Sequence, residues 1–326
     1  MINNKITTLI SIALSGFAII TGLWYIVTTE PDTADRQTRQ AEPKPYYNQE
    51  NNAQDIQIIP EPETEANVLL IGFDERGLGD AIIIVSYNLE TFESTLISIK
   101  RDTYVDFQTW SEAGHGHSAL AWAAYVGTGY GGEDYLQGAK QMAETVEELL
   151  GIEINSYAGI TFTDLIVLVD LIGGVTVDVA PGFAERSEDP LTPGRQHLTG
   201  EEALIFARHR SNPRIPEPGS LSTDGDRIRR HHQLLKAMFL QLGTLSANEL
   251  LELLEKADQK LHTNMDYWEM LFFASVFYEQ DPSLTETAVL PGELKTVYED
   301  HLDQELEYFF LDLAECNKLL RDLGVK

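Results

Sequence analysis

The sequence predicts an α/β protein in which helices cover a central sheet, and two observations support that class. Short runs rich in Ile and Val, separated by Gly, Asn and Asp, are typical of strands, and three such runs fall between residues 67 and 99. Later segments place apolar residues at helical spacing, with further strand-like runs between them. Strands and helices mixed along a chain in this way indicate a sheet packed against helices.

Length and composition narrow the class of function. The 326 residues are enough for one large domain or two small ones, and a hydrophobic content of 43% permits a sizeable core. The net charge of -29 argues against a nucleic-acid-binding protein, because binding to a phosphate backbone needs a basic surface. The single cysteine, Cys316, excludes an intrachain disulfide and a zinc site built from cysteines.

The N-terminal region predicts a membrane anchor. Residues 6–28 are uncharged and mostly apolar, and they are long enough to cross a bilayer as one helix. Lys5 precedes the run and Glu30 follows it, which places residues 1–5 in the cytoplasm and the bulk of the chain outside the plasma membrane. A cleaved signal peptide is the alternative, but the apolar run exceeds a typical signal sequence and no small-residue cleavage site follows it.

A linker and a large domain are expected after the anchor. Residues 29–65 are rich in Pro, Gln, Asn and acids and lack any apolar period, so we expect a flexible tether that keeps the domain near the lipid surface. Residues 66–326 then form the extracytoplasmic domain.

Charged residues gather at the ends of the first strands of this domain. The runs at 67–71, 81–87 and 94–99 are expected to be strands, and the last two form a hairpin. Strand ends in an open α/β sheet commonly bind ligands, because backbone and side-chain polar groups face solvent there. We therefore expect five charged side chains to converge on one polyanion and its metal ion: Asp74, Arg76, Asp80, Arg101 and Asp102. Among them, Asp102 is expected to orient Arg101.

The middle of the domain alternates helices and strands. Residues 110–132, rich in Gly, Ala and aromatic residues, suit a loop with a short helix that closes over a groove. Residues 133–150 carry an amphipathic helical stripe, which Gly151 ends. The elements expected next are a strand at 157–161, a helix at 162–171 capped by Thr163, a Gly173-Gly174 terminator and an alternating strand at 175–179.

Two arginine-rich stretches follow in this otherwise acidic chain. Thr199 is expected to cap a helix, and beyond it Arg208 and Arg210 stand two apart, so an extended backbone would point both the same way. A second helix, over 226–233, would place Arg227, Arg230 and His231 on one side. A solvated charge run balanced by nearby acids is the alternative. The spacing favours an anion site, because arginine binds phosphate oxygens through two N–H groups at once.

The C-terminal part is expected to be mainly helical. Helices are predicted at 248–260, 267–278 and 304–321, and a short strand at 287–290. In the second of these helices, apolar residues including Trp268 and Phe272 fit either a protein core or a lipid groove, and a core is the better expectation.

With these residues in view, the chain resembles the LytR-CpsA-Psr family of cell-envelope glycopolymer transferases. The similarity runs from about residue 67 to the C-terminus, preceded by a tether and a single membrane helix. It is carried by four blocks in order: NVLLIGFDER, SIKRDT, LIGGVTVDV, and HLTGEEALIFARHR followed by DGDRIRRHHQ. Each block alone is a weak signal, but their order and spacing together are specific.

The resemblance implies an α/β/α sandwich with a mixed central sheet, preceded by one transmembrane helix. It also implies a hydrophobic groove for a polyprenyl tail, and a polar mouth that binds the pyrophosphate through Mg²⁺ and arginines. Such an enzyme is anchored in the plasma membrane and transfers a glycopolymer from a polyprenyl-pyrophosphate carrier to a hydroxyl of peptidoglycan or another envelope acceptor.

The resemblance assigns roles residue by residue. Asp74 and Asp80 become the magnesium-linked or base-like acids, and Arg101 joins them as a catalytic residue. The residues expected to bind the substrate are Arg76, Arg208, Arg210, Arg227, Arg230 and His231.

The chain also departs from the family pattern. Leu78-Gly79 stands where the family usually has Arg-Ser, a lysine of the later loop is replaced around His115, and His231 stands in place of a glutamine. These changes keep a second hypothesis open, in which a non-catalytic envelope protein binds polyprenyl phosphates or glycans. A transcriptional regulator is disfavoured by the membrane run and the acidic composition.

Overall fold

The computed structural model describes residues 65–88, 91, 93–106, 119–180, 183, 191–209, 223–257, 260–279, 285–300 and 302–325. These residues all belong to one compact unit, Pro60–Lys326. The predicted cytoplasmic N-terminus, membrane helix and almost all of the linker lie outside the described residues, as does Arg210. Within the described part of the chain, no helix combines the length and the apolar character needed to span a bilayer.

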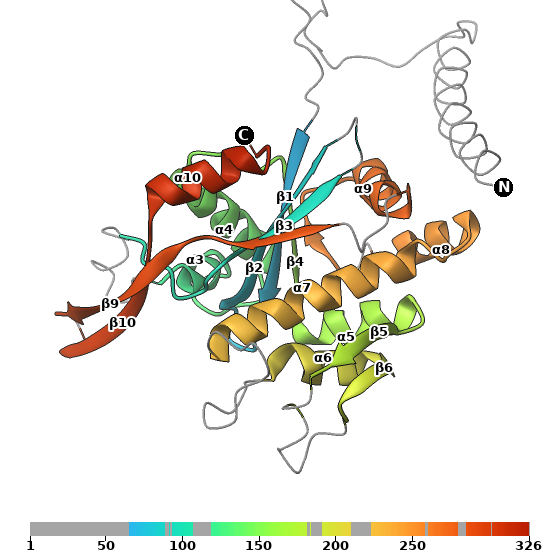
Figure 1. Cartoon of the computed structure of the whole chain (residues 1–326), viewed down its shortest axis with the longest axis horizontal. Helices are drawn as coiled ribbons and strands as arrows, with labels where there is room; N and C mark the ends of the chain where they lie inside the picture. Colours follow the sequence, from blue (N-terminus) through green and yellow to red (C-terminus); the bar gives the residue numbers. More distant parts are fainter. Residues whose placement is uncertain are drawn as a thin grey trace, which may run out of the picture. The chain divides into compact units, whose positions relative to one another are not determined.

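A six-stranded mixed sheet forms the centre of the described domain, as expected (Figure 1). Three consecutive antiparallel strands build its middle: β1 (Glu65–Phe73), β2 (Gly79–Asn88) and β3 (Ser94–Ile99). The flanking strands are β4 (Ser156–Ile160), parallel to β1; β8 (Glu286–Val289), parallel to β3; and β7 (His262–Thr263), antiparallel to β4. Because side chains alternate along a strand, Val68 and Leu69 begin two different cores.

The first core is built with three helices on one face of the sheet. These helices are α3 (Ala121–Gly127), α4 (Tyr135–Leu150) and α10 (Leu313–Asp322). They bury Leu69, Ile71 and Ile84 of the sheet together with Met142 of α4. As predicted, Gly151 ends α4 in the left-handed conformation, which glycine adopts without steric cost.

The second core lies on the opposite face, so the domain is an α/β/α sandwich. Its helices are α5 (Phe162–Leu171), α6 (Gly200–Arg208), α7 (Thr223–Leu242), α8 (Ala247–Ala257) and α9 (Tyr267–Glu279). They pack with Val68, Ile83 and Leu96 of the sheet. A two-stranded hairpin, β5 (Val175–Val179) with β6 (Gly194–Leu198), lies beside α6 and α7, and its first strand has the predicted bounds.

Two local predictions were wrong. The N-cap of α5 is Thr161, not Thr163: the Thr161 hydroxyl accepts a hydrogen bond from the Asp164 amide at 3.2 Å, and the Asp164 carboxylate accepts one from the Thr161 amide at 3.1 Å. The helix predicted at 304–321 is instead a strand followed by a helix. In the strand, Leu306 and Tyr308 alternate with Glu305 and Glu307, which is the period of a strand and not of a helix.

That C-terminal segment forms a separate hairpin of β9 (Gly292–Glu299) and β10 (Gln304–Leu311) before α10 begins. Asp312 ends the strand and caps α10, because its carboxylate accepts hydrogen bonds from the amides of Ala314 and Glu315, each at 3.1 Å. By contrast, the cap predicted at Thr199 is confirmed at the start of α6.

Candidate functional site

A cavity of about 510 Å³ lies between the sheet and the helices of the second core. Its walls are apolar over most of their area and come from β1, β2, α5, α7, α8 and α9; they include Leu70, Leu165, Leu234, Met238, Leu254 and Phe273. The charged or imidazole side chains that line it are Asp80, Arg208, Arg227 and His231. An apolar space with a few polar groups at one end suits a ligand that has an apolar tail and a charged head.

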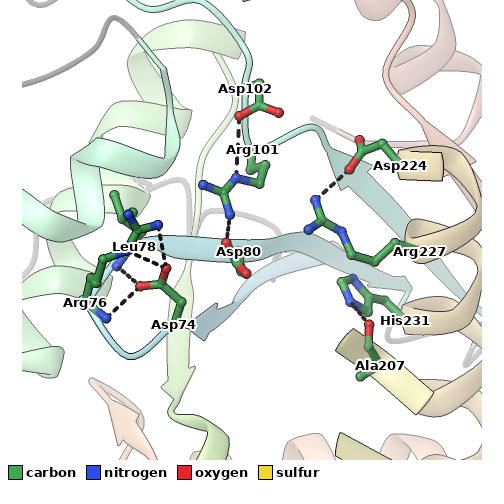
Figure 2. A network of polar contacts seen from close by, with 10 residues as sticks. All are labelled: Asp74, Arg76, Leu78, Asp80, Arg101, Asp102, Ala207, Asp224, Arg227 and His231. Carbon is green, nitrogen blue, oxygen red and sulfur yellow. Dashed lines mark hydrogen bonds and ion pairs between the residues drawn. The ribbon is translucent and has the colours of Figure 1, made fainter. Parts of the chain in front are cut away.

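Asp80 and Arg101 meet where β2 begins and β3 has just ended. The pairing of Ile82 with Ile99 brings these two strand ends together, and the Arg101 guanidinium forms an ion pair with the Asp80 carboxylate (Figure 2). The Nε of Arg101 lies 3.4 Å from the Asp102 carboxylate. Asp102 therefore contacts Arg101 from the side away from Asp80, as expected for a residue that orients the guanidinium.

Arg227 extends from the first turns of α7 beside this pair. Its guanidinium donates a 2.5 Å hydrogen bond to Asp224, and the residue is only 7% exposed. The Nε of Arg227 is buried and has no hydrogen-bond partner among the described residues. A smaller pocket lined by Asp80, Arg101, Asp224 and Arg227 adjoins the main cavity, with which it shares Asp80 and Arg227. Leaving a buried N–H of a charged guanidinium without a hydrogen bond is costly. The site therefore favours an anionic ligand that can accept this hydrogen bond.

His231 lies one turn further along α7 and is held in a neutral form. Its Nε2 is 3.2 Å from the Ala207 carbonyl at the end of α6, which is the geometry of an N–H donating to that oxygen (Figure 2). Removal from water, reinforced by the nearby charge of Arg227, lowers the pKa of His231 to about 3. At neutral pH the positive charge of the site therefore comes from arginines, while His231 fixes α6 against α7.

Asp74 organises the turn between β1 and β2. Its Oδ1 accepts hydrogen bonds from the amides of Arg76 and Leu78, both at 2.9 Å, and its Oδ2 pairs with the Arg76 guanidinium at 3.1 Å. Gly77, with φ near +80°, completes the turn, and Leu78 is buried. The Arg76 side chain is 67% exposed, so this ion pair lies at the surface. Asp74 thus lies at the start of this short turn and Asp80 lies just after its end.

Arg208 joins this turn to the cavity from the end of α6. It lines the cavity, lies 4.3 Å from the centre of the Phe162 ring, and is 3.6 Å from the carboxylate of Glu75. The backbone is not extended at Arg208, because α6 remains helical up to that residue.

The structure therefore separates the predicted site residues into three groups. Asp80, Arg101, Arg208, Arg227 and His231 line the cavity or the adjoining pocket. Asp74 and Arg76 form the neighbouring turn. Arg230 is elsewhere: it is buried, donates to the His209 carbonyl and lies 6.0 Å from the Phe183 ring. The roles assigned to all of these residues stay predictions.

Two contacts at the site were missed in the sequence. Asp224 holds Arg227, and an acid three residues before an arginine on a helix was a usable signal. The second contact joins Ser98 of β3 to His232 of α7, with the hydroxyl oxygen 2.7 Å from Nε2. Burial lowers the pKa of His232 to about 4. This pair links the strand that precedes Arg101 to the helix that carries Arg227.

Two further expectations about the cavity were wrong. The described part of the segment 110–132 does not cover it, because α3 packs on α4 at the other face of the sheet. In α9, Trp268 and Phe272 are exposed instead of buried, whereas Met270 and Phe273 line the cavity.

The described carboxylates could bind a magnesium ion only if a bound ligand supplied further oxygen atoms to it. Among the described residues, no group of three or more His, Cys, Asp or Glu side chains is arranged to hold a metal. Asp74 and Asp80 nevertheless provide hard oxygen donors at one turn, and Mg²⁺ commonly uses one or two carboxylates together with substrate phosphates. The donor set therefore fits Mg²⁺ that is shared with a bound diphosphate.

Fold and site together define a class: an α/β/α domain with an apolar cavity that ends at arginines and carboxylates. The model of the LytR_cpsA_psr family matches residues 25–323, so the chain belongs to this family, as predicted.

Similar proteins and solved structures support the same assignment. The chain is 28% identical, over 233 residues, to the polyisoprenyl-teichoic acid–peptidoglycan teichoic acid transferase TagU of Bacillus cereus, which spans 70% of this chain and 69% of that protein. The crystal structure of TagV from B. subtilis is similar with a TM-score of 0.61 at 25% identity, covering 81% of this chain and 98% of that one. A structure of TagT bound to LIIa-WTA has a TM-score of 0.59 at 25% identity, covering 81% and 92%.

Proposed function

We propose that this protein is a membrane-anchored transferase that moves a phosphate-linked glycopolymer from a polyprenyl-pyrophosphate carrier to a hydroxyl of peptidoglycan or another envelope acceptor. The observation that carries the proposal is the apolar cavity of about 510 Å³ that ends at Asp80, Arg208 and Arg227. The names of relatives such as TagU support the same reaction class. The anchor would be residues 6–28, with the domain outside the plasma membrane.

The cavity would select the donor by its two chemically different ends. Leucine and methionine side chains from α7 and α8 suit the isoprenoid tail, because burial of apolar surface is favourable in proportion to its area. Arg227 and Arg208 suit the diphosphate, since a guanidinium binds two phosphate oxygens at once. Arg101, oriented by Asp102, would reach the same group through the adjoining pocket.

In the proposed reaction, the acceptor hydroxyl oxygen attacks the phosphorus atom that bears the glycan. The bond from that phosphorus to the bridging oxygen breaks, and polyprenyl monophosphate leaves with the bond's electron pair. Arg101 and Arg227 would stabilise the negative charge that develops on the leaving phosphate. The hydroxyl proton would pass to a carboxylate, for which Asp80 and Asp74 are the candidates. Mg²⁺ held by the diphosphate and by the acid that does not take the proton would neutralise further charge on the phosphates.

The test is turnover by the full chain in phospholipid vesicles, with a polyprenyl-pyrophosphate glycan, Mg²⁺ and a peptidoglycan fragment. We expect a phosphate-bearing conjugate, and we expect Arg101→Ala to slow its formation by about 10²-fold or more. Arg101→Lys, which preserves the charge beside Asp80, should retain part of the rate. The matched control is Arg195→Ala, on the exposed face of β6, which should react at the wild-type rate. Equal rates for Arg101→Ala and the control would contradict the proposal.

A non-catalytic binding protein is the second candidate, and the contacts of Asp74 favour keeping it. Both oxygens of Asp74 are engaged by the turn and by Arg76, so the carboxylate is committed to local structure. If Asp74→Ala binds the lipid diphosphate as tightly as wild type while neither protein converts it with any acceptor, the binding function replaces the transferase. Loss of turnover in Asp74→Ala alone supports the transferase.

A further inference from the structure

Helix α9 exposes large apolar side chains on the side opposite to the cavity. Trp268 is 57% exposed and Phe272 is 46% exposed, and a spacing of four residues puts them on one side of the helix. Leu251 of the neighbouring α8 is 38% exposed. The other side of α9 contributes Met270 and Phe273 to the cavity wall. The same two helices therefore bound the apolar end of the cavity and present apolar groups outward.

This exposed group lies at the end of the sheet where the chain enters the domain. The Phe273 ring is 5.8 Å from the ring of Tyr87, and Tyr87 pairs with Ala66, the second residue of β1. Figure 1 shows α9 near the start of β1. Asp80 is at the other end of β2, roughly 25 Å away at the rise of an extended strand. The 64 residues before β1, with the apolar run 6–28 and its tether, thus join the domain on the side of α9.

We propose that the outward face of α9 and Leu251 of α8 dock on the surface of the lipid bilayer, so that a donor's tail passes from the membrane into the apolar end of the cavity. This inference rests on the proposed function, and it adds the orientation of the domain on the membrane. Tryptophan and phenylalanine suit the contact, because amphipathic and aromatic rings favour the boundary between headgroups and acyl chains. The tail would then bridge the distance between the bilayer and the arginines at the far end.

The charges around the patch limit the kind of membrane. Glu252 and Glu255 of α8, Asp266 before α9 and Glu269 within α9 outnumber the exposed Lys256 of α8, so this surface has no net attraction for anionic lipids. The contact is therefore apolar in origin, and it should weaken as the fraction of anionic lipid rises.

The first experiment measures the contact without any donor. The full chain is placed in vesicles of phosphatidylcholine with brominated acyl chains, which quench tryptophan fluorescence at close range. The chain has four tryptophans, so single substitutions identify the quenched ring. Trp268→Phe should remove part of the quenchable intensity. Trp122→Phe, which removes a ring from α3 on the other side of the sheet, should leave the quenchable intensity unchanged.

The outcomes of that measurement are separate from catalysis. Loss of quenchable intensity only in Trp268→Phe supports membrane docking whether or not the protein is a transferase. An equal loss of quenchable intensity in both variants, or no loss in either, overturns the docking proposal and leaves the proposed function in place.

The second experiment uses turnover to test the route of the tail. The double variant Trp268→Glu and Phe272→Glu should raise the KM for a long-tailed donor in vesicles at least fivefold. It should not change the KM for a short-tailed donor that is dissolved in water. Unchanged KM values for both donors would contradict the route, and so would equal increases for both, because an equal increase indicates a damaged cavity.

Discussion

One face of the sheet is filled and the other is hollow, although both faces carry mainly apolar side chains. On the filled face, α4 approaches closely through small residues: a side chain at Gly138 would meet the Phe73 ring at 3.2 Å and Thr128 at 2.8 Å. On the hollow face, Leu234 and Met238 of α7 line a cavity of about 510 Å³ that separates them from the sheet. Glycine and alanine allow helix and sheet to touch, whereas rows of long side chains hold the helices apart.

The two faces of the sheet also differ in their polar side chains. The charged side chains of the hollow face, Asp80, Arg208 and Arg227, gather where the apolar wall stops. On the filled face, Cys316 is buried, its thiol donates a hydrogen bond to the Pro291 carbonyl at 3.4 Å, and burial raises the pKa of that thiol to about 11. The comparison indicates that the filled face is packed for stability, whereas the hollow face carries the candidate binding site.

The largest expected effect comes from truncating one methionine on each face. Met142→Ala should cost about 2–5 kcal/mol of unfolding free energy, because the fully buried side chain leaves a new cavity. Met238→Ala should cost less than about 1 kcal/mol, since its side chain already borders a cavity. Urea unfolding of both variants checks the difference. Similar losses would show that the hollow face is packed like the filled one.

The second prediction concerns the buried guanidinium at the rim. Arg227→Ala should lower kcat/KM for the lipid donor by about 10²-fold or more. The residue is buried beside Asp80, and its Nε–H has no hydrogen-bond partner among the described residues, so it is available to a phosphate oxygen. Arg227→Lys should recover part of the loss. Circular dichroism and thermal unfolding serve as the check that the Ala variant is folded. A folded Arg227→Ala variant with the wild-type kcat/KM would remove Arg227 from the site.

The third prediction is a dependence of stability on pH that arises on the hollow face. The folded pKa of His231 is about 3, below its ordinary value of 6.5, so only the unfolded chain takes up a proton between these values. The stabilising contribution is complete above pH 6.5 and is lost as pH falls toward 3, with a slope approaching about 1.4 kcal/mol per pH unit. His231→Gln should flatten this slope between pH 6 and pH 4 as measured by urea unfolding. An unchanged slope would show that His231 takes up its proton in the folded state.

The smallest prediction compares two helix caps. Asp134 caps α4 on the filled face, and Thr161 caps α5 while also lining the cavity. Asp134→Ala and Thr161→Ala should each cost about 1 kcal/mol of stability. Thr161→Ala alone should also weaken donor binding, by a small factor of about two or three, because its hydroxyl borders the ligand. Equal donor affinities in the two variants would exclude Thr161 from the binding surface.

Much of the fold follows from local patterns in the sequence. The strand Val175–Val179 alternates strictly, and the helix that starts after Thr199 has both members of a capping box, so neither needed tertiary information. The strand Gln304–Leu311 was missed because Tyr308, Phe309 and Phe310 are consecutive and weaken the alternation, while the apolar residues of α10 extend a helical pattern across Asp312.

The candidate site was only partly predictable. Arg101 and Asp80 follow from strand ends that a hairpin brings together, and Asp102 follows from its neighbour in sequence. The separation of Arg230 from Arg227 could not be predicted from the sequence, because it depends on how α7 is rotated against α6. The cavity could not be inferred either, since leucines that line a cavity have the same spacing as leucines that fill a core.

The most direct test of the account is calorimetric binding of a short polyprenyl diphosphate in the presence of Mg²⁺. The comparison uses wild type, Met238→Trp, which fills the hollow face, and Arg227→Ala, which removes a rim charge. We expect each variant to bind at least tenfold more weakly than wild type, because tail and head are held by different ends of one cavity. Wild-type affinity in a folded Met238→Trp variant would show that the tail does not enter the cavity and would contradict the account.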